Sequence, residues 1–532
     1  MSEKAQRVEY KGRRKIYTDY DYIDETNVIS ALGESLIVHD QNRSEVQFLI
    51  DFEKGLQPLV REKVVREDID ITSISNLAHQ ITEFWLGYFW GNHMAFVQKS
   101  DKHPKEVKSD DSDSAITMLN EMYDSEDMEK KDQLLAYYIE VCGTCCQLID
   151  IKRNYVEDDS VFDLATLNPL YSFVVYSSNA YEKPMMGVSY SEKKDGSKIY
   201  TCITDKRVFI IKNAMKIING ELEEKLDENE KPIYLFGERS GEANPFGVIN
   251  IVEFERAIDR TGVFERQLDE LNALNVMESD LVNDISQTTQ AIWWGNDIKF
   301  PKDEVTGETS KISGGQWLLT EGNGNQTQKP AIQALSLDYD YAGVLANIQS
   351  KHDYILERAF TPRQTDQSGG STTGATSMSS GWTATEAVAC KQSAIVKSGY
   401  KVRNKLALIA IKKSPDIKTD SPLLTLKNTD IDIRPIRQKT FDMATKVNSL
   451  ATMIQNMVNP RDAMEAIDFF PNLAETVEDS KDMMFEFQKS ILSSKQSTTA
   501  TSTTQQSDVN PVTSRIMQDS SDNAQNSPLS DL

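Results

Sequence analysis

The stretch "VFERQLDELNALNVMESDLVNDISQTTQAIWW", residues 263–294, carries the clearest helical pattern in this chain of 532 residues. Its apolar positions follow one another at intervals of three or four residues; they are Phe264, Leu268, Leu271, Leu274, Met277, Leu281 and Ile285. A mean spacing of about 3.5 residues is typical of a seam that packs against another long helix. We therefore predict one long helix over residues 263–294, with mainly acidic side chains on its other faces.

A second amphipathic pattern covers residues 337–361, and the segment between the two patterns has a different character. Residues 295–336 are rich in turn residues and contain one good strand pattern, "QWLLT". Two helices of similar length on either side of a β-rich segment indicate a stalk that runs outward and returns.

The next segment, "TDQSGGSTTGATSMSSGWTATEA" at residues 365–387, interrupts a strongly helical region with Gly, Ser and Thr. A phosphate-binding loop needs a Lys soon after its glycines and an apolar strand before them. Here no Lys follows Gly374 until Lys391, and the preceding residues have a helical pattern. The alternative is a flexible surface loop, although loops of this length in compact domains are often functional.

A further helix is predicted near residues 384–413, and its charge is the reverse of that of the whole chain. No acidic residue lies between Glu386 and Asp416, whereas the formal net charge of the chain is −24. Two interpretations remain open for its basic residues: a solvated face that pairs with acidic neighbours, or a surface close to a polyanion. The basic residues are Lys391, Lys397, Lys401, Arg403, Lys405, Lys412 and Lys413.

Composition narrows the class of protein. A net charge of −24 opposes tight, sequence-independent binding of DNA phosphates, but it does not exclude DNA that passes nearby. The N-terminus lacks the apolar core of a signal peptide, and the most apolar window contains Glu83 and His93 and is too short to span a bilayer. We therefore expect a protein that is made and used in a cytoplasm.

The five cysteines are odd in number, which argues against a framework of disulfides. Cys142, Cys145 and Cys146 lie close together in "VCGTCCQLID", but no second Cys or His pair completes a zinc site. The surrounding residues are apolar, so we predict buried structural thiols.

Several stretches, taken in order, resemble the portal proteins of tailed bacteriophages, in particular the siphophage-type family. "NLAHQITEFWLGYFWGNHMAFV" looks like the family's early helix with its Tyr-x-x-Gly turn, here Tyr88 to Gly91, and "YSFVVYS", "MMGVSYS" and "KIYTCITDKRVFII" match its wing strands. The most specific match is Gly247 to Phe254, followed by "LDELNALN" and Ser279–Asp280, although Asn250 replaces the usual proline. "MSSGWTATEAVACK" corresponds to the family's Ser-Gly segment after its second stem helix, and the resemblance covers roughly residues 45–490.

The resemblance implies an α+β, portal-type fold and a division of the chain. The expected parts are an N-terminal arm (1–45), an α/β wing (46–262), a stem helix (263–294), a small β-rich clip (295–336), a second stem helix (337–361), a tunnel loop (362–386), an upper wing and mainly helical crown (387–493), and a disordered C-terminal tail (494–532).

The resemblance also implies a function and partners. Portal subunits form a ring, usually of twelve, at one capsid vertex, and double-stranded DNA passes through the ring during packaging and ejection. The ring docks the terminase large subunit and later head-completion or adaptor proteins, and major capsid and scaffold proteins surround it. The expected place is the virion, after assembly in the host bacterial cytoplasm, with no membrane. The alternative is another ring-forming virion structural or connector protein.

Three groups of residues are assigned roles by this resemblance, and no catalytic residue, cofactor or metal is expected. The first group would face the DNA channel: Gln367, Ser368, Ser371, Thr372, Thr373, Thr376, Ser377, Ser379 and Ser380. The second would form a basic band near the DNA: Lys391, Lys397 and Lys401. The third would dock partners at the clip: Lys302, Asp303, Glu304 and Trp317.

A nuclease or packaging motor is the competing class. It would need an acidic metal cluster on strands or a nucleotide loop beside a strand. The carboxylate pairs Asp68–Asp70 and Asp430–Asp432 exist, but the sequence places no third ligand and no base beside them. We therefore expect a structural protein and no enzyme.

Overall fold

The computed structural model describes residues 12–59, 70–92, 94–99, 110–156, 159–194, 198–212, 215–218, 221–224, 241–289, 292–296, 298–299, 321–322, 331–335, 340–363, 381–435, 443–456 and 458–467, with six single residues beyond these. The chain divides into two compact units, residues 1–438 and 439–532. The mixture of helices and strands confirms the predicted α+β class.

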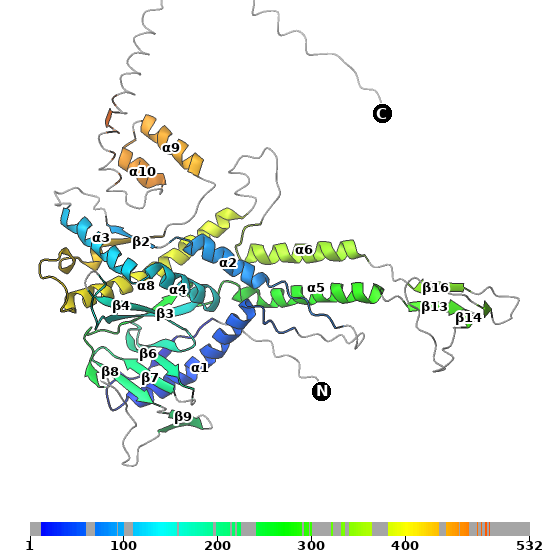
Figure 1. Ribbon diagram of the computed structural model, residues 1–532, viewed down its shortest axis with the longest axis horizontal. Helices are drawn as coiled ribbons and strands as arrows, with labels where there is room; N and C mark the ends of the chain where they lie inside the picture. Colours follow the sequence, from blue (N-terminus) through cyan, green and yellow to red (C-terminus); the bar gives the residue numbers. More distant parts are fainter. Residues whose placement is uncertain are drawn as a thin grey trace, which may run out of the picture. The chain divides into compact units, whose positions relative to one another are not determined.

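A six-stranded sheet with a covering helix forms one part of the first unit (Figure 1). Its strands, in spatial order, are β1 (Ile16–Thr18), β5 (Ser172–Ser177), β6 (Pro184–Glu192), β7 (Lys198–Ile203), β8 (Arg207–Lys212) and β11 (Glu242–Ala243). β1 pairs in parallel with β5, and the other pairs are antiparallel. Because side chains alternate along a strand, Phe173 and Val175 join the core under α1 (Val28–Glu53), whereas Val174 joins a second cluster on the other face.

The main core lies around a three-stranded sheet with the order β12 (Ile251–Glu255), β3 (Thr144–Ile151) and β4 (Phe162–Leu167). The helices that contribute apolar side chains to it include α2 (Leu77–Trp90), α3 (Asp110–Ser125), α4 (Met128–Cys142) and α8 (Trp382–Lys413). Gly399 lets α8 lie close to β12, because a Cβ at this position would overlap the ring of Phe254. The predicted helix near residues 384–413 is thus confirmed as α8.

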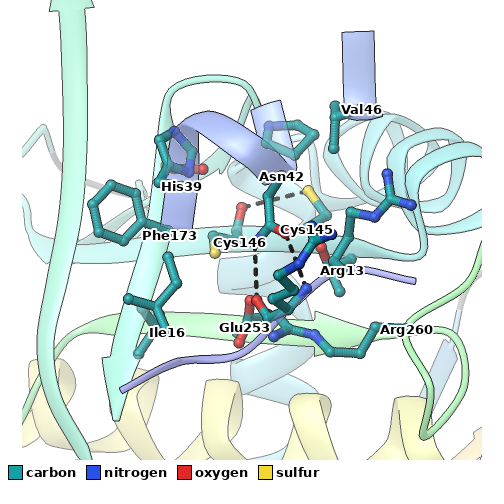
Figure 2. A pocket seen from close by; sticks show the side chains of 15 residues that line it. Arg13, Ile16, His39, Asn42, Val46, Cys145, Cys146, Phe173, Glu253 and Arg260 are labelled. Atoms are coloured by element: carbon teal, nitrogen blue, oxygen red, sulfur yellow. Dashed lines mark hydrogen bonds and ion pairs between the residues drawn. The ribbon is translucent and has the colours of Figure 1, made fainter. Parts of the chain in front are cut away.

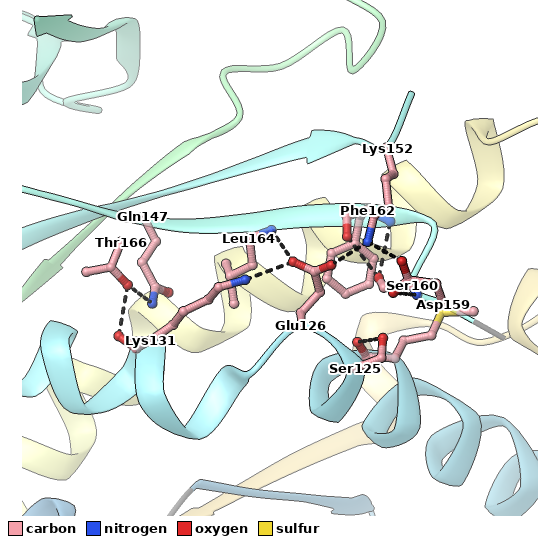
Figure 3. A network of polar contacts seen from close by, with 11 residues as sticks. Ser125, Glu126, Lys131, Gln147, Lys152, Asp159, Ser160, Phe162, Leu164 and Thr166 are labelled. Atoms are coloured by element: carbon pink, nitrogen blue, oxygen red, sulfur yellow. Dashed lines mark hydrogen bonds and ion pairs between the residues drawn. The ribbon is translucent and has the colours of Figure 1, made fainter. Parts of the chain in front are cut away.

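Polar contacts fix the corner between α3 and α4 against this sheet (Figure 3). The Glu126 carboxylate accepts hydrogen bonds from Lys131 at 2.9 Å, from Lys152 at 3.0 Å and from the Leu164 amide at 3.0 Å. Burial opposes ionisation of this carboxyl, but these hydrogen bonds prevail and lower the pKa of Glu126. The corner is therefore held by a charged group that stays ionised at neutral pH.

Three chain segments cross just before the first of the two long helices that the sequence predicts. Gly143, with φ of +83°, turns the chain from α4 into β3, and a Cβ there would overlap the carbonyl oxygen of Arg260. The main-chain amide of Val263 donates to the main-chain carbonyl of Glu140 at 2.7 Å. The main-chain amide of Arg13 donates to the main-chain carbonyl of Arg260 at 3.1 Å. The N-terminal arm, the α4–β3 turn and the segment before the helix are therefore joined by their main chains.

The segment after this crossing forms the 3-10 helix η1 (Glu265–Gln267) and then α5 (Leu268–Thr289). α6 (Tyr341–Arg358) lies beside α5 (Figure 1), and Lys351 forms an ion pair with Glu270. Between the two helices, β13 (Ile292–Asn296) pairs with β16 (Ala331–Leu335), and β14 (Ile298–Lys299) pairs with β15 (Glu321–Gly322). The helix predicted over residues 263–294 is too long at its C-terminal end, because residues 292–294 belong to a strand.

Other boundaries also differ from the prediction. α1 begins at Val28, inside the expected N-terminal arm. Within the expected wing, residues 110–125 form the helix α3, and residues 137–142 belong to α4. "QWLLT" and the tail from residue 494 lie outside the described residues.

The remaining elements are short. β17 (Ile431–Pro435) pairs with β2 (Met94–Gln98), and β9 (Met215–Ile218) pairs with β10 (Glu221–Glu224). The 3-10 helices η2 (Pro422–Leu424) and η3 (Asn428–Asp430) lie between α8 and β17 in the sequence. In the second unit, the described elements are α9 (Met443–Gln455) and α10 (Pro460–Ile467). Among the described helices, none has the length and apolarity to cross a membrane.

Candidate functional site

The structure describes the base of the Gly/Ser/Thr segment and the helix that follows it. The expected channel-facing residues from Gln367 to Ser380 lie outside the described residues, as do Lys302, Asp303, Glu304 and Trp317. Their roles therefore stay predictions. The described part of the candidate site consists of the end of α6, the start of α8 and the basic residues along α8.

The two ends of the Gly/Ser/Thr segment are held together where they leave and rejoin the folded body. α6 ends at Arg358, shortly before Phe360, which has φ of +54°, and α8 begins after Gly381, which has φ of +90°. The Thr385 hydroxyl donates to the carbonyl of Phe360 at 2.6 Å, and the Trp85 indole donates to the carbonyl of Ala359 at 3.2 Å. Hydrogen bonds from α8 and α2 thus satisfy carbonyls at the end of α6 and fix both ends of the segment.

An aromatic cluster supports the start of α8. The Trp382 ring lies 5.9 Å from the Phe84 ring and 5.6 Å from the Tyr88 ring, measured between centroids, and Phe84 and Tyr88 stack at 5.6 Å. The Tyr88 hydroxyl also donates a hydrogen bond to Glu386. Aromatic pairs at these separations add to the free energy of burial, so the first turn of α8 is anchored to α2.

The basic residues of α8 do not form a single surface. Lys391, Lys401 and Lys405 are exposed and lie on one stripe of the helix, whereas Lys397 is half-buried. In the described part of the chain, no carboxylate lies within ion-pair distance of Lys391 or Lys401. The roles of Lys391 and Lys401 therefore stay predictions.

The sequence analysis wrongly grouped Arg403 with the surface cations of this helix. Arg403 is fully buried and belongs to no surface band. Its guanidinium donates to Asp132 at 2.7 Å and to Gln147 at 3.3 Å, and it lies 4.3 Å from the Tyr400 ring centroid. The Tyr400 hydroxyl donates to the other oxygen of Asp132 at 2.9 Å, and burial raises the pKa of Tyr400. This cation therefore attaches α8 to α4 and β3.

A second buried charge attaches α8 on another side. Glu140 of α4 is fully buried and accepts hydrogen bonds from the Trp90 indole at 2.9 Å, from Arg256 at 2.7 Å and from the Gln392 amide. Gln392 follows Lys391 directly, so this contact sets the rotation of α8 that leaves Lys391 exposed. No local sequence pattern indicates these partners, which lie 50, 116 and 252 positions from Glu140.

Cys145 and Cys146 line a cavity of about 20 Å³ beside the N-terminal arm (Figure 2). This volume holds about one water molecule, so it is not a ligand site. Burial raises the pKa of the thiols of Cys142, Cys145 and Cys146, which confirms the prediction of buried structural thiols. Among the described residues, no group of His, Cys, Asp or Glu is arranged to hold a metal ion.

Comparison with protein families identifies the class. The chain belongs to the phage portal proteins, which are structural proteins of the phage capsid that take part in capsid assembly and DNA packaging. The matching family is described as "Phage portal protein, SPP1 Gp6-like", and the match covers residues 62–484. Comparison with curated proteins gives no match. The resemblance to siphophage-type portal proteins is thus confirmed.

Proposed function

We propose that the chain forms a ring, of about twelve copies, at one capsid vertex, and that double-stranded DNA passes through the ring during packaging and ejection. The observation that carries the proposal is the family match over residues 62–484. The packed pair α5 and α6, which is joined by small paired strands and followed by a segment with a fixed base, supports it.

The proposed parts keep the boundaries expected from the sequence. Residues 263–294 and 337–361, which contain α5 and α6, act as the stem, with residues 292–294 in strand β13, and residues 295–336 act as the clip. Residues 362–386 form the tunnel loop. In the clip, Lys302, Asp303, Glu304 and Trp317 contact the terminase large subunit and later the head-completion proteins.

Weak contact with DNA is a physical requirement of this function, because the genome has to move without being held. The serine, threonine and glycine residues between Gln367 and Ser380 offer hydroxyl and backbone groups but no cation. Each such group contacts a phosphate weakly, whereas each Lys or Arg that neutralises a phosphate adds strong, salt-dependent affinity. The hydrogen bond between Thr385 and Phe360, which joins the two ends of the segment at its base, supports this role.

Lys391, Lys397 and Lys401 form the proposed basic band close to the DNA. The exposed side chains of Lys391 and Lys401 support this role most directly. A few cations per subunit, set in a chain with a net charge of −24, centre the duplex in the ring without trapping it.

The first test is the mass of the purified chain, followed by negative-stain imaging. Twelve copies of a 60.1 kDa chain (12 × 60.1) total roughly 720 kDa, and images should show a ring with a central hole. A compact dimer or tetramer without a hole, both alone and with scaffold protein, contradicts the proposal.

The second test separates the basic band from the ring itself. The double variant Lys391→Glu with Lys401→Glu should assemble normally but should lower DNA packaging or retention at least several-fold. Lys418→Glu is the matched control, because Lys418 is also exposed and lies beyond α8. If the double variant packages and retains DNA like the control, the band has no role in DNA transport even though the ring proposal stands.

A further inference from the structure

The buried side of α5 changes its chemistry halfway along the helix. Up to Leu274, its buried side chains include the apolar residues Leu268 and Leu271. Among the α5 side chains beyond Leu274 that the structure describes, the buried ones are polar: Asn275, Ser279 and Asn283. They lie four residues apart, so they share one face of the helix. The apolar seam predicted to continue through Met277, Leu281 and Ile285 is therefore not the buried face.

Two of these polar side chains bind the main chain of an extended segment, residues 70–76. The Asn283 side-chain oxygen accepts from the Ile71 amide at 2.8 Å, and its NH2 group donates to the Ile71 carbonyl at 3.0 Å. The Ser279 hydroxyl accepts from the Ser73 amide at 2.9 Å and donates to the Ser73 carbonyl at 2.9 Å. Each side chain thus binds both main-chain groups of one residue.

The third polar side chain holds the end of the same segment. The Asn275 amide donates to Gln57 at 2.5 Å, and Gln57 donates to Asn76 at 2.8 Å. Asn76 has φ of +48° and donates to the carbonyl of Glu53 at the end of α1. Residue 76 therefore ends the segment at a fixed point between α1 and α2.

The repeat of the contacts follows from the geometry of helix and strand. Four residues of an α-helix rise about 6.0 Å, and two residues of an extended chain span about 6.6 Å. A polar residue at every fourth helix position can therefore meet every second residue of an extended segment that runs antiparallel to the helix. The match worsens with each step, so only a few such contacts can form in register.

We propose that residues 70–76 are a latch on α5, which the helix recognises through main-chain groups and which opens and closes as one unit without unfolding of the core. None of the side chains at residues 70–76 is buried, and Ile71 is 44% exposed. The segment thus has no fully buried apolar anchor. Segments with few buried apolar contacts open locally at a free energy below that of global unfolding.

The latch has a consequence for α5. Beyond Leu274, this helix buries Ser279 and Asn283 against the latch, and both side chains lose these partners when it opens. The closed latch therefore stabilises the C-terminal half of α5, from Asn275 onward, in its position on the body of the first unit. This inference goes beyond the proposed function and requires neither a ring nor DNA.

Amide hydrogen exchange of the full-length chain tests the proposal. Asn283→Ala removes the partner of Ile71 but leaves the Ser279 hydroxyl in place. We expect the protection of both the Ile71 and the Ser73 amides to fall, by ~10-fold or more, because the loss of one hydrogen bond with a buried group shifts opening of the whole latch. Amides in the core strand β6 should keep their protection.

Ser286→Ala is the matched control on the same helix, because the Ser286 hydroxyl donates to the α5 carbonyl of Val282 at 2.9 Å and, among the described residues, binds no part of the latch. It should leave both amides protected. Loss of protection at Ile71 alone in Asn283→Ala, with Ser73 unchanged, would show independent hydrogen bonds and would overturn the latch. Equal protection of Ile71, Ser73 and the β6 amides in the wild type would overturn it as well, since opening would then require global unfolding.

A pair of variants in the segment itself tests main-chain recognition without changing α5. Ser73→Ala keeps the amide and carbonyl, so it should leave the protection of Ile71 unchanged. Ser73→Pro removes the amide that donates to Ser279 and should lower the protection of Ile71 at least ~10-fold. If Ser73→Ala has the larger effect, or if Ser73→Pro has none, recognition through the main chain is wrong.

Discussion

Removal of the charge that faces Arg403 should destabilise the first unit more than any change at the protein surface. Arg403 is fully buried, and the side chain of Asp132 is 7% exposed. Asp132→Ala leaves a buried guanidinium that retains the Gln147 side-chain oxygen, the Met128 sulfur and aromatic faces as contacts. Tyr400 loses the acceptor of its hydroxyl at the same time.

Asp132→Ala should lower the free energy of unfolding by about 3–5 kcal/mol, the usual result when one partner of a buried ion pair is removed. Native proteins are stable by about 5–15 kcal/mol, so this change uses a large part of the total. Replacement of both partners, in Asp132→Leu with Arg403→Met, should cost less than either single change, because no unpaired charge remains in the core.

Urea unfolding followed by tryptophan fluorescence measures these effects, with the four proteins of the double-mutant cycle compared under one condition. Lys405→Met is the matched control, since Lys405 lies on the same helix but is exposed. It should change the free energy of unfolding by less than about 0.5 kcal/mol. If Asp132→Ala costs less than about 1 kcal/mol, or if the double variant costs as much as the sum of the single ones, the buried pair does not hold α8 in place.

Three further predictions follow from single sites. Gly143→Ala should destabilise the protein by about 1–3 kcal/mol, because the residue has positive φ and a Cβ would overlap the Arg260 carbonyl. Gly87→Ala, in open space within α2, should instead stabilise the protein by about 0.5–1 kcal/mol. Thermal unfolding of the two variants compares these effects. Burial lowers the pKa of His39 from 6.5 to about 4, so on acidification the unfolded chain binds a proton before the folded chain does. Stability should therefore fall by about 3 kcal/mol between pH 6.5 and 4, and His39→Gln should remove that part of the pH dependence of unfolding; an unchanged pH dependence would contradict it. Titration with a thiol reagent should modify Cys390 alone in the native protein and all five cysteines after denaturation, because burial suppresses the reactivity of the other four; fast modification of more than one native thiol would show that the cluster is accessible.

Local periodicity explains how much of the fold was predictable. The helical spacing in residues 384–413 and the alternating runs from "YSFVVYS" to "RVFIIKN" appear in the structure as α8 and strands β5 to β8. Prediction failed where the same local pattern suits two structures. Residues 292–294 continue a helical pattern in the sequence, but their pairing with residues 333–335 makes them a strand.

The candidate site was predictable only in its composition. The sequence alone determined the family, the charge reversal along residues 387–415 and the burial of the cysteine cluster, because each of these depends on residue types and their local order. It did not distinguish Arg403 from Lys391, since both are cations on one helix. Asp132 makes that distinction from 271 residues away, through an ion pair that only the folded chain can form.

The same reason applies to α5. Its sequence shows an apolar stripe through Ile285 and a polar stripe through Asn275, Ser279 and Asn283, and either one suits a helix. Residues 71 and 73, more than two hundred positions earlier, bind the polar stripe and decide which face is buried. Residue types and their spacing therefore determined that α5 is a helix, whereas tertiary contacts decided its orientation, because burial depends on partners that local sequence does not specify.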